Sequence, residues 1–251
     1  ACLRAPSPES WLMLRSFTFG RNETERLQTV YRLKTYFRAV FYEAKDIDVD
    51  GVQTMPIGML EMYMRRGRAE ALSAALAAAR MDASSKDRKL LVAFSNLGFS
   101  EESPPNFSDP GIQSRHVQCL RSRLAARRWA HTAAGRAAGA EVRSIERHAY
   151  FGELARYRFM LSPLGAGVQC PKLVEALMVL TVPIVQRVPA MDDVARLGFP
   201  IVVVEDWPDI SELGLEHWWR ALASRLPSFR KHCLTTEAYW RIFTGQLDAC
   251  H

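Results

Sequence analysis

Residues 157–185 read YRFMLSPLGAGVQCPKLVEALMVLTVPIV. An apolar run at residues 159–161 is followed by a loop with two glycines, then by an amphipathic helix, then by a second apolar run at residues 182–185. This order of strand, glycine loop, helix and strand is typical of a βαβ unit, whose two strands lie parallel in one sheet. The segment therefore predicts an α/β fold with a Rossmann-like parallel sheet.

The loop of this unit follows the carboxyl end of its first strand, where open α/β sheets bind their ligands. It contains Ser162, Pro163, Gly165 and Gly167. Glycines let the backbone approach an anion closely, and the N-terminus of the following helix attracts negative charge. The loop is therefore a candidate for binding phosphate groups.

Two charged side chains on the predicted helix extend this candidate site. Lys172 adds a positive charge in the first turn, and Glu175 can accept hydrogen bonds from sugar hydroxyls. The alternative for Glu175 is a surface residue in an i,i+4 ion pair, but the later position of such a pair is Val179. A phosphate donor and a diol acceptor on one helix suit a nucleotide.

Strands and helices alternate along the rest of the chain, so we expect helices on both faces of the sheet. Apolar runs predict further strands at residues 38–42, 52–56, 89–95, 141–145 and 201–204. Helical patterns lie at residues 22–37, 70–81, 112–138 (with a break near Trp129), 150–157 and 192–197, and in two or three C-terminal helices. A polar linker at residues 82–88 separates an N-terminal α/β region, residues 1–85, from a Rossmann-like domain with C-terminal helices, residues 86–251.

Composition narrows the functional classes. With 48% hydrophobic and 24% charged residues the chain is globular, and no run approaches the roughly 20 apolar residues that span a bilayer. The net charge of +6 fits equally a basic surface with no particular partner and a surface that attracts anions such as nucleotide-sugars or acidic glycans. We do not expect nucleic-acid binding, because the basic residues of the 112–138 helix lack interleaved aromatics and fit a solvated face: Arg121, Arg123, Arg127 and Arg128.

The five cysteines show no metal-binding spacing, and their pairing cannot be read from the sequence: Cys2, Cys119, Cys170, Cys233 and Cys250. An acidic turn at residues 46–51 contains a D-x-D triplet, but it lacks the glycine and glutamate positions of a calcium loop. We therefore expect no metal.

The 157–185 segment also resembles a known family. Its aromatic-x-L-S-P-x-G-x-G motif, followed by a basic residue, E-A-L and V-P-I-V, is similar to the donor-binding segment of exostosin-like glycosyltransferases, most of all the group that includes ribitol xylosyltransferase and many algal proteins. The similarity covers roughly residues 89–207, including MDDV at 191–194 and FPIVVVEDW at 199–207. It reaches weakly to MPIG at residues 55–58.

This resemblance implies a GT-B-type enzyme in which residues 86–251 bind a nucleotide-sugar and residues 1–85 are a shortened acceptor-side half. It implies inverting, metal-independent transfer of a hexosyl or pentosyl group, from a UDP-linked donor to a glycan, a glycoprotein or another hydroxyl acceptor, without a cofactor. It also implies the Golgi lumen, with any membrane contact through an anchor outside this chain.

The resemblance also assigns roles to residues. The donor-binding set is Ser162, Pro163, Gly165, Gly167, Lys172, Glu175 and Arg115, the last of which follows the long loop after the 89–95 strand. The catalytic base is not fixed by the sequence. Glu43 and Asp46, with Asp48, are candidates because they follow the predicted 38–42 strand, and His116 and His148 are weaker ones.

Departures from the family pattern leave two alternatives open. Where the family has Asp, then Cys-His-Arg, then Trp, this chain has Gln169, Cys170, Pro171, Lys172 and Val174. A lysine keeps the charge but not the forked geometry that grips a diphosphate. One alternative is thus a catalytically inactive exostosin-like module that binds a nucleotide or a glycan. A dinucleotide-dependent oxidoreductase is the other, although the third glycine of its fingerprint is missing.

Overall fold

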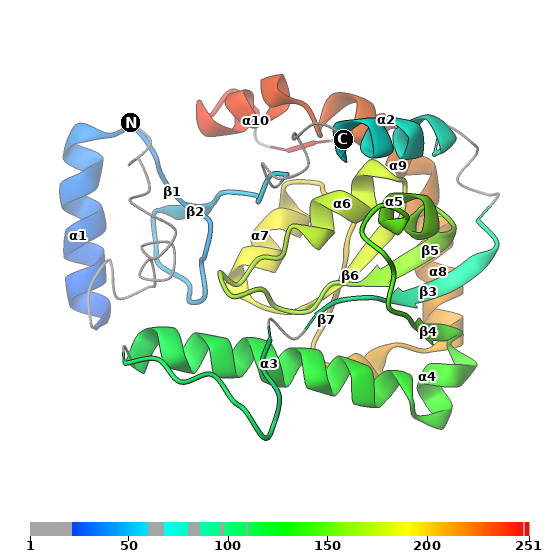
Figure 1. Cartoon of the computed structure of the whole chain (residues 1–251). Helices are drawn as coiled ribbons and strands as arrows, with labels where there is room; N and C mark the ends of the chain where they lie inside the picture. The colour runs from blue at the N-terminus through cyan, green and yellow to red at the C-terminus, as the bar shows by residue number, and fades with distance from the viewer. Residues whose placement is uncertain are drawn as a thin grey trace.

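The computed structural model describes residues 22–59, 68–79, 86–95, 98–108, 110–247 and 249–250. A five-stranded parallel sheet lies at the centre, with helices on both of its faces, and a two-stranded parallel sheet lies beside it (Figure 1). The α/β fold with a Rossmann-like parallel sheet that the sequence predicts is therefore confirmed.

The central sheet has the strand order β4-β3-β5-β6-β7, and every neighbouring pair is parallel. Its strands are β3 (Arg88–Val92), β4 (Ala140–Val142), β5 (Tyr157–Leu161), β6 (Val182–Gln186) and β7 (Val202–Val204). Alternate residues enter two different cores: Leu90 and Phe159 pack on one face, whereas Leu91 and Met160 pack on the other. Burial on both faces explains why these strands are apolar without alternation.

Some helices of this domain begin at a polar residue whose side chain caps them. The predicted break near Trp129 lies between α3 (Pro110–Ala130) and α4 (Ala133–Ala137), because the Thr132 side chain accepts from the Gly135 N–H and starts a new helix. Ser211 caps α8 in the same way. The remaining helices are α5 (Tyr150–Leu154), α6 (Lys172–Met178), α7 (Pro189–Arg196), α8 (Glu212–Leu222), α9 (Leu226–His232) and α10 (Thr236–Phe243), with 3-10 turns η5 (Trp207–Asp209) and η6 (Ala223–Arg225).

The N-terminal region contributes α1 (Glu23–Tyr36), β1 (Val40–Tyr42), β2 (Val52–Thr54) and α2 (Arg68–Ala78). Strands β1 and β2 pair in parallel, with Val40 opposite Val52. Tyr42 and Val52 belong to the same buried cluster as Phe159 of the central sheet. Helix α2 packs against α5 on the other face. Buried clusters thus cross the predicted division at residues 85 and 86, and most of the predicted linker lies outside the described residues.

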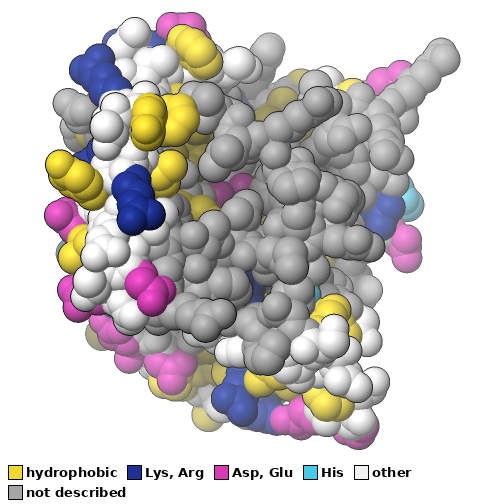
Figure 2. All heavy atoms as spheres, turned by 90° about the vertical axis from the view of Figure 1, so that its left-hand side faces the viewer, with side chains coloured by type: hydrophobic (Ala, Val, Ile, Leu, Met, Phe, Trp, Pro, Cys, Tyr) yellow, Lys and Arg dark blue, Asp and Glu magenta, His cyan; other side chains and the backbone are white. Residues whose placement is uncertain are grey.

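The surface of α1 is partly apolar. Leu27, Tyr31 and Tyr36 are exposed on this helix. Figure 2 views the molecule from this side and shows hydrophobic side chains interspersed with lysine, arginine and acidic side chains. Among the helices that the structure describes, none combines the length and apolar character that a membrane crossing requires.

A disulfide joins Cys233 to Cys250, with their Cα atoms 5.9 Å apart. The Cys250 N–H donates to Leu197 O (2.7 Å), which seats the end of the chain against α7. Gly198 is required at this contact, because its φ is +89° and a Cβ there would lie 1.9 Å from Cys250 O. Cys119 and Cys170 are buried free thiols, and Cys2 lies outside the described residues.

Candidate functional site

The strand order reverses between β3 and β5. The chain leaves β3 for β4 on one side of it, then returns to β5 on the other side. Ligands of open α/β sheets bind at such a switch point, outside the carboxyl ends of the two strands. The glycine loop follows β5 at this edge, so the predicted loop lies where the fold offers a binding crevice.

The glycine loop folds back on itself. The Gly165 N–H donates to Val168 O (3.1 Å) and the Val168 N–H donates to Gly165 O (3.0 Å). A Cβ on Gly165 would lie 2.2 Å from Gln169 O, whereas one on Gly167 would meet no atom within 4 Å. Gly165 thus permits a close approach within the loop itself, and the two N–H groups that close the loop face its own carbonyls. Whether the loop also contacts a donor stays a prediction.

Val168 in this loop has a φ of +75°. A β-branched residue in the left-handed region is a genuine backbone outlier, with a cost of about 1–3 kcal/mol. Such strain persists only where surrounding contacts enforce it, and it concentrates at functional sites. Ser162 and Pro163, at the start of the loop, are buried. The Ser162 N–H donates to Ile184 O (2.8 Å), which continues the pairing of β5 with β6.

Arg123 of α3 joins the two strand ends of the switch point. Its Nε donates to Leu164 O (3.1 Å) and its Nη1 donates to Ser95 O. The Arg127 guanidinium donates to Phe94 O, and both arginines lie over the Phe94 ring at 5.9 and 5.4 Å. Neither arginine has a carboxylate partner among the described residues. A positive charge is therefore buried at the switch point, since Arg123 is only 4% exposed.

The sequence-based assignment of these arginines to a solvated face is wrong for Arg123, which is buried, and for Arg127, which is half-buried; Arg121 and Arg128 are exposed. The signal was present in the spacing. Residues four apart share one side of a helix, and Arg115, Cys119, Arg123 and Arg127 follow this interval. Arg115, a predicted donor-binding residue, is buried on α3 two turns before Arg123.

Lys172 and Glu175 meet each other at the start of α6. Lys172 Nζ donates to Glu175 Oε2 (3.3 Å) and to Tyr150 Oη (3.0 Å), and it lies 4.1 Å from the centre of the Tyr150 ring. Glu175 is 2% exposed. We expected it to lack an ion-pair partner because of Val179, but its partner lies three residues earlier. Both side chains are thus engaged within the fold, and their contact with a nucleotide stays a prediction.

Gln169 connects the glycine loop to the N-terminal region. Its Nε2 donates to Glu43 O and Met55 O, both at 2.7 Å, and its Oε1 accepts from the Ile57 N–H (2.9 Å). Met55 and Ile57 belong to the MPIG segment, so the two segments that the family resemblance linked are in contact. Because these bonds fall just after β1 and β2, the carboxyl ends of both parallel sheets face one another here.

Glu43 stands at this junction, directly after β1. Burial raises the pKa of its carboxyl group to about 7. Asp46 is half-buried further along the same turn. Asp48 is exposed and pairs with Lys45 (2.7 Å), and the hydrogen bond from Lys45 holds its pKa below the ordinary value. Within the described part of the chain, no three metal-binding side chains come together.

In comparisons with known proteins, no protein-family model and no curated protein matches the chain.

Proposed function

We propose that this chain is a glycosyltransferase, or part of one, that moves a hexosyl or pentosyl group from a nucleotide-sugar to a hydroxyl acceptor with inversion. One observation carries the proposal. Gln169 holds the carboxyl ends of two parallel sheets against each other, and Glu43, with a pKa of about 7, lies where they meet. Transfer between two bound substrates needs such a junction, with one substrate held on each side.

The central sheet supplies the donor side. The buried charge of Arg123 and the neighbouring Arg127 give the switch point a positive potential that favours a diphosphate. Val168 lies in the loop between these arginines and the N-terminal region. Its left-handed backbone, which valine disfavours, is the kind of strain that concentrates at functional sites. In this proposal these groups stabilise the negative charge of the nucleoside diphosphate as it leaves, in the place of a metal ion.

The N-terminal region supplies the base. A group with a pKa near 7 is available as a carboxylate at neutral pH and is still basic enough to accept a proton. The acceptor O–H proton passes to Glu43 as the acceptor oxygen bonds to the anomeric carbon. The bond from that carbon to the diphosphate breaks in the same step, so the configuration inverts and the diphosphate leaves with the bonding pair.

The disulfide supports the expected compartment. Disulfides persist in oxidising compartments such as the secretory pathway and are rare in the cytosol. The Cys233–Cys250 bond is therefore compatible with a Golgi-lumenal enzyme acting on glycan or glycoprotein acceptors.

A second candidate function, a nucleotide- or glycan-binding module without activity, is favoured by two observations. Glu175 is buried against Lys172, and the N–H groups of Gly165 and Val168 are satisfied by carbonyls of their own loop. Residues that the family resemblance assigns to the donor are thus used to hold the fold together.

Titration of the whole chain with UDP, paired with transfer assays using labelled UDP-sugars, separates these functions. We expect UDP to bind and one UDP-sugar to be transferred. Glu43→Gln should lower the transfer rate at least about 100-fold, the scale of a lost general base, while UDP affinity is unchanged. Lys172→Ala should weaken UDP binding by about 1–3 kcal/mol.

Asp50→Asn is the control, because Asp50 is an exposed acid in the same turn as the base candidates. UDP binding without transfer of any sugar would select the inactive module. Binding of NAD in preference to UDP would select the oxidoreductase. No nucleotide binding at all would contradict the transferase and the oxidoreductase and leave only a module that binds a glycan.

A further inference from the structure

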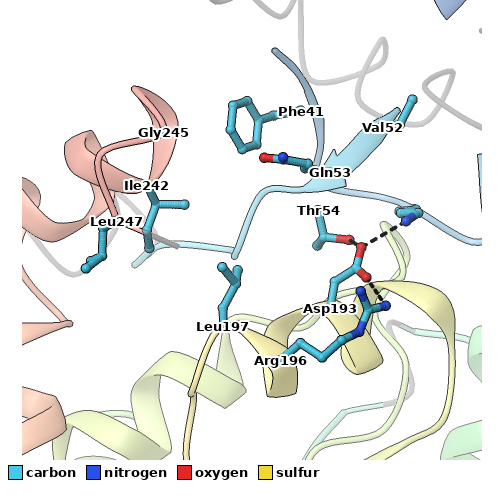
Figure 3. A pocket seen from close by; sticks show the side chains of 11 residues that line it. Phe41, Val52, Gln53, Thr54, Asp193, Arg196, Leu197, Ile242, Gly245 and Leu247 are labelled. Carbon is cyan, nitrogen blue, oxygen red and sulfur yellow. Dashed lines mark hydrogen bonds and ion pairs between the residues drawn. The ribbon is translucent and has the colours of Figure 1, made fainter. Parts of the chain in front are cut away.

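A cavity of about 270 Å³ lies away from the glycine loop, where three parts of the chain meet (Figure 3). Strands β1 and β2 form one side, α7 forms the floor, and the end of α10 with the following segment closes the third side. No residue of the 162–169 loop lines it. The cavity is slightly smaller than the ~300–1,000 Å³ typical of drug-sized ligands, so it suits a smaller molecule.

One wall of this cavity is charged and centred on Asp193. Its Oδ2 accepts from Lys45 Nζ (2.9 Å) and Thr54 Oγ1 (2.6 Å), and its Oδ1 accepts from Arg196 Nη2 (Figure 3). Burial alone would lower the pKa of Lys45, but its hydrogen bonds to Asp48 and Asp193 raise it above the ordinary value, so Lys45 is charged. The lining carries Lys45, Arg196 and Asp193. Asp48 pairs with Lys45 from outside the lining (2.7 Å), so the two cations are matched by two carboxylates, and Arg196 is the cation with nitrogens to spare.

Two groups on this wall keep hydrogen-bond donors for a ligand. The Arg196 side chain is 72% exposed, and its hydrogen bond to Asp193 uses one guanidinium nitrogen, which leaves the other two nitrogens of the fork. The Gln53 amide has no hydrogen-bond partner among the described residues, and Figure 3 shows it pointing toward the cavity. Asp193 itself is already satisfied by three donors.

The opposite wall is apolar. Leu197, Ile242 and Leu247 line this side, and Phe41 lies above them (Figure 3). The Phe41 ring is held by an edge-to-face contact with Phe243, at 5.5 Å between centroids. Burial of a hydrocarbon against these side chains would be favourable in proportion to its area.

We propose that this cavity binds a small amphipathic carboxylate. The anionic head pairs with the Arg196 fork, since guanidinium groups match carboxylates in two-point geometry. The Gln53 amide, beside Phe41, is a further donor of the lining for a polar group elsewhere on the ligand. The short aliphatic or aromatic body lies on Phe41, Leu197 and Leu247. The exposed fork of Arg196 on one wall and hydrocarbon on the other distinguish this ligand from a sugar, which would need acceptors that the saturated Asp193 does not offer. The proposal does not depend on the glycosyltransferase proposal.

The test uses the full chain and calorimetric titration with hexanoate, hexanamide, hexylamine, acetate and a methyl pyranoside. Hexanoate should bind about tenfold more tightly than hexanamide, which keeps the body but lacks the charge, and than acetate, which keeps the charge but lacks the body. Hexylamine should not bind. Arg196→Gln should remove the preference for hexanoate over hexanamide while circular dichroism shows an unchanged fold.

Arg187→Gln is the matched control, because Arg187 is another exposed arginine that pairs with an acid of α7, Asp192, but does not line the cavity. It should leave hexanoate binding unchanged. Equal binding of hexanoate and hexanamide, an equal loss in both arginine variants, preferential binding of a methyl pyranoside, or no binding at millimolar concentration would each overturn the proposal.

Discussion

At the scale of single residues, Glu43 couples the stability of the fold to pH. Its carboxyl pKa is about 7 in the folded chain and 4.5 as an ordinary glutamate. The folded state therefore holds this proton more tightly than the unfolded state between these values. Its contribution to the free energy of unfolding falls as pH rises from about 4.5 through 7, and it stays low above that.

Replacing Glu43 with Gln removes this titration. We expect the variant to gain about 1–3 kcal/mol of unfolding free energy at about pH 8, because no charged group then remains buried there. Urea denaturation across pH 4–8 measures this gain. In the Asp50→Asn variant the unfolding free energy should depend on pH as in the wild type. If the unfolding free energy of Glu43→Gln fell with pH as steeply as that of the wild type, Glu43 would not be the buried group that titrates.

At the scale of elements, the two glycines of the loop after β5 should differ in their tolerance of alanine. Gly165→Ala places a Cβ 2.2 Å from a backbone oxygen that no rotamer change can move, so we expect a loss of about 2–4 kcal/mol. Gly167→Ala meets open space and should change stability by no more than about 0.5 kcal/mol. Thermal unfolding of the two variants side by side measures the difference; similar losses in both would contradict this loop geometry.

Local patterns predicted the elements themselves. The unit from β5 through α6 to β6 follows from apolar runs and a glycine loop within thirty residues, and the break at Thr132 follows from a capping residue. The order of strands does not follow, because an apolar run fixes burial but not which neighbour it pairs with. The burial of Arg123 was missed because its acceptors, Ser95 O and Leu164 O, lie at the ends of two separate strands.

The candidate site shows the same limit. The sequence places Glu43 after a strand, but its raised pKa comes from burial, which the local sequence does not show. Gln169 looked like the loss of a carboxylate, whereas its partners lie 112 or more residues away and give the amide a structural role that an acid could not fill. Contacts at such separation leave no mark on local composition or periodicity.

At the scale of the whole molecule, buried bonds tie the N-terminal region to the central domain. Besides the Gln169 contacts, Lys45 pairs with Asp193, the Ala190 N–H donates to Lys45 O (3.1 Å), and the Tyr239 hydroxyl donates to Ile57 O (2.9 Å). A shared hydrophobic cluster lies behind them. We therefore expect the two regions to unfold together in one cooperative transition.

Gln169→Ala tests this dependence. The change leaves the Ile57 N–H and the carbonyls of Glu43 and Met55 without their partner, so we expect a loss of about 2–4 kcal/mol in one cooperative transition. Gln246→Ala, at an exposed position, should be nearly neutral. Two separate unfolding transitions in the wild-type chain, followed by fluorescence and circular dichroism, would contradict the idea of one cooperative body.

The bonds around Gln169 also restrict how a ligand can enter. Many two-lobed enzymes open and close by rotation of one lobe about a hinge. Here such a rotation would have to break several buried hydrogen bonds and remove Tyr42 and Val52 from the core that they share with Phe159. A ligand of the proposed site, where the two sheets meet, would therefore enter and leave between fixed walls. Its recognition would be closer to a lock and key than to closure of two lobes around it.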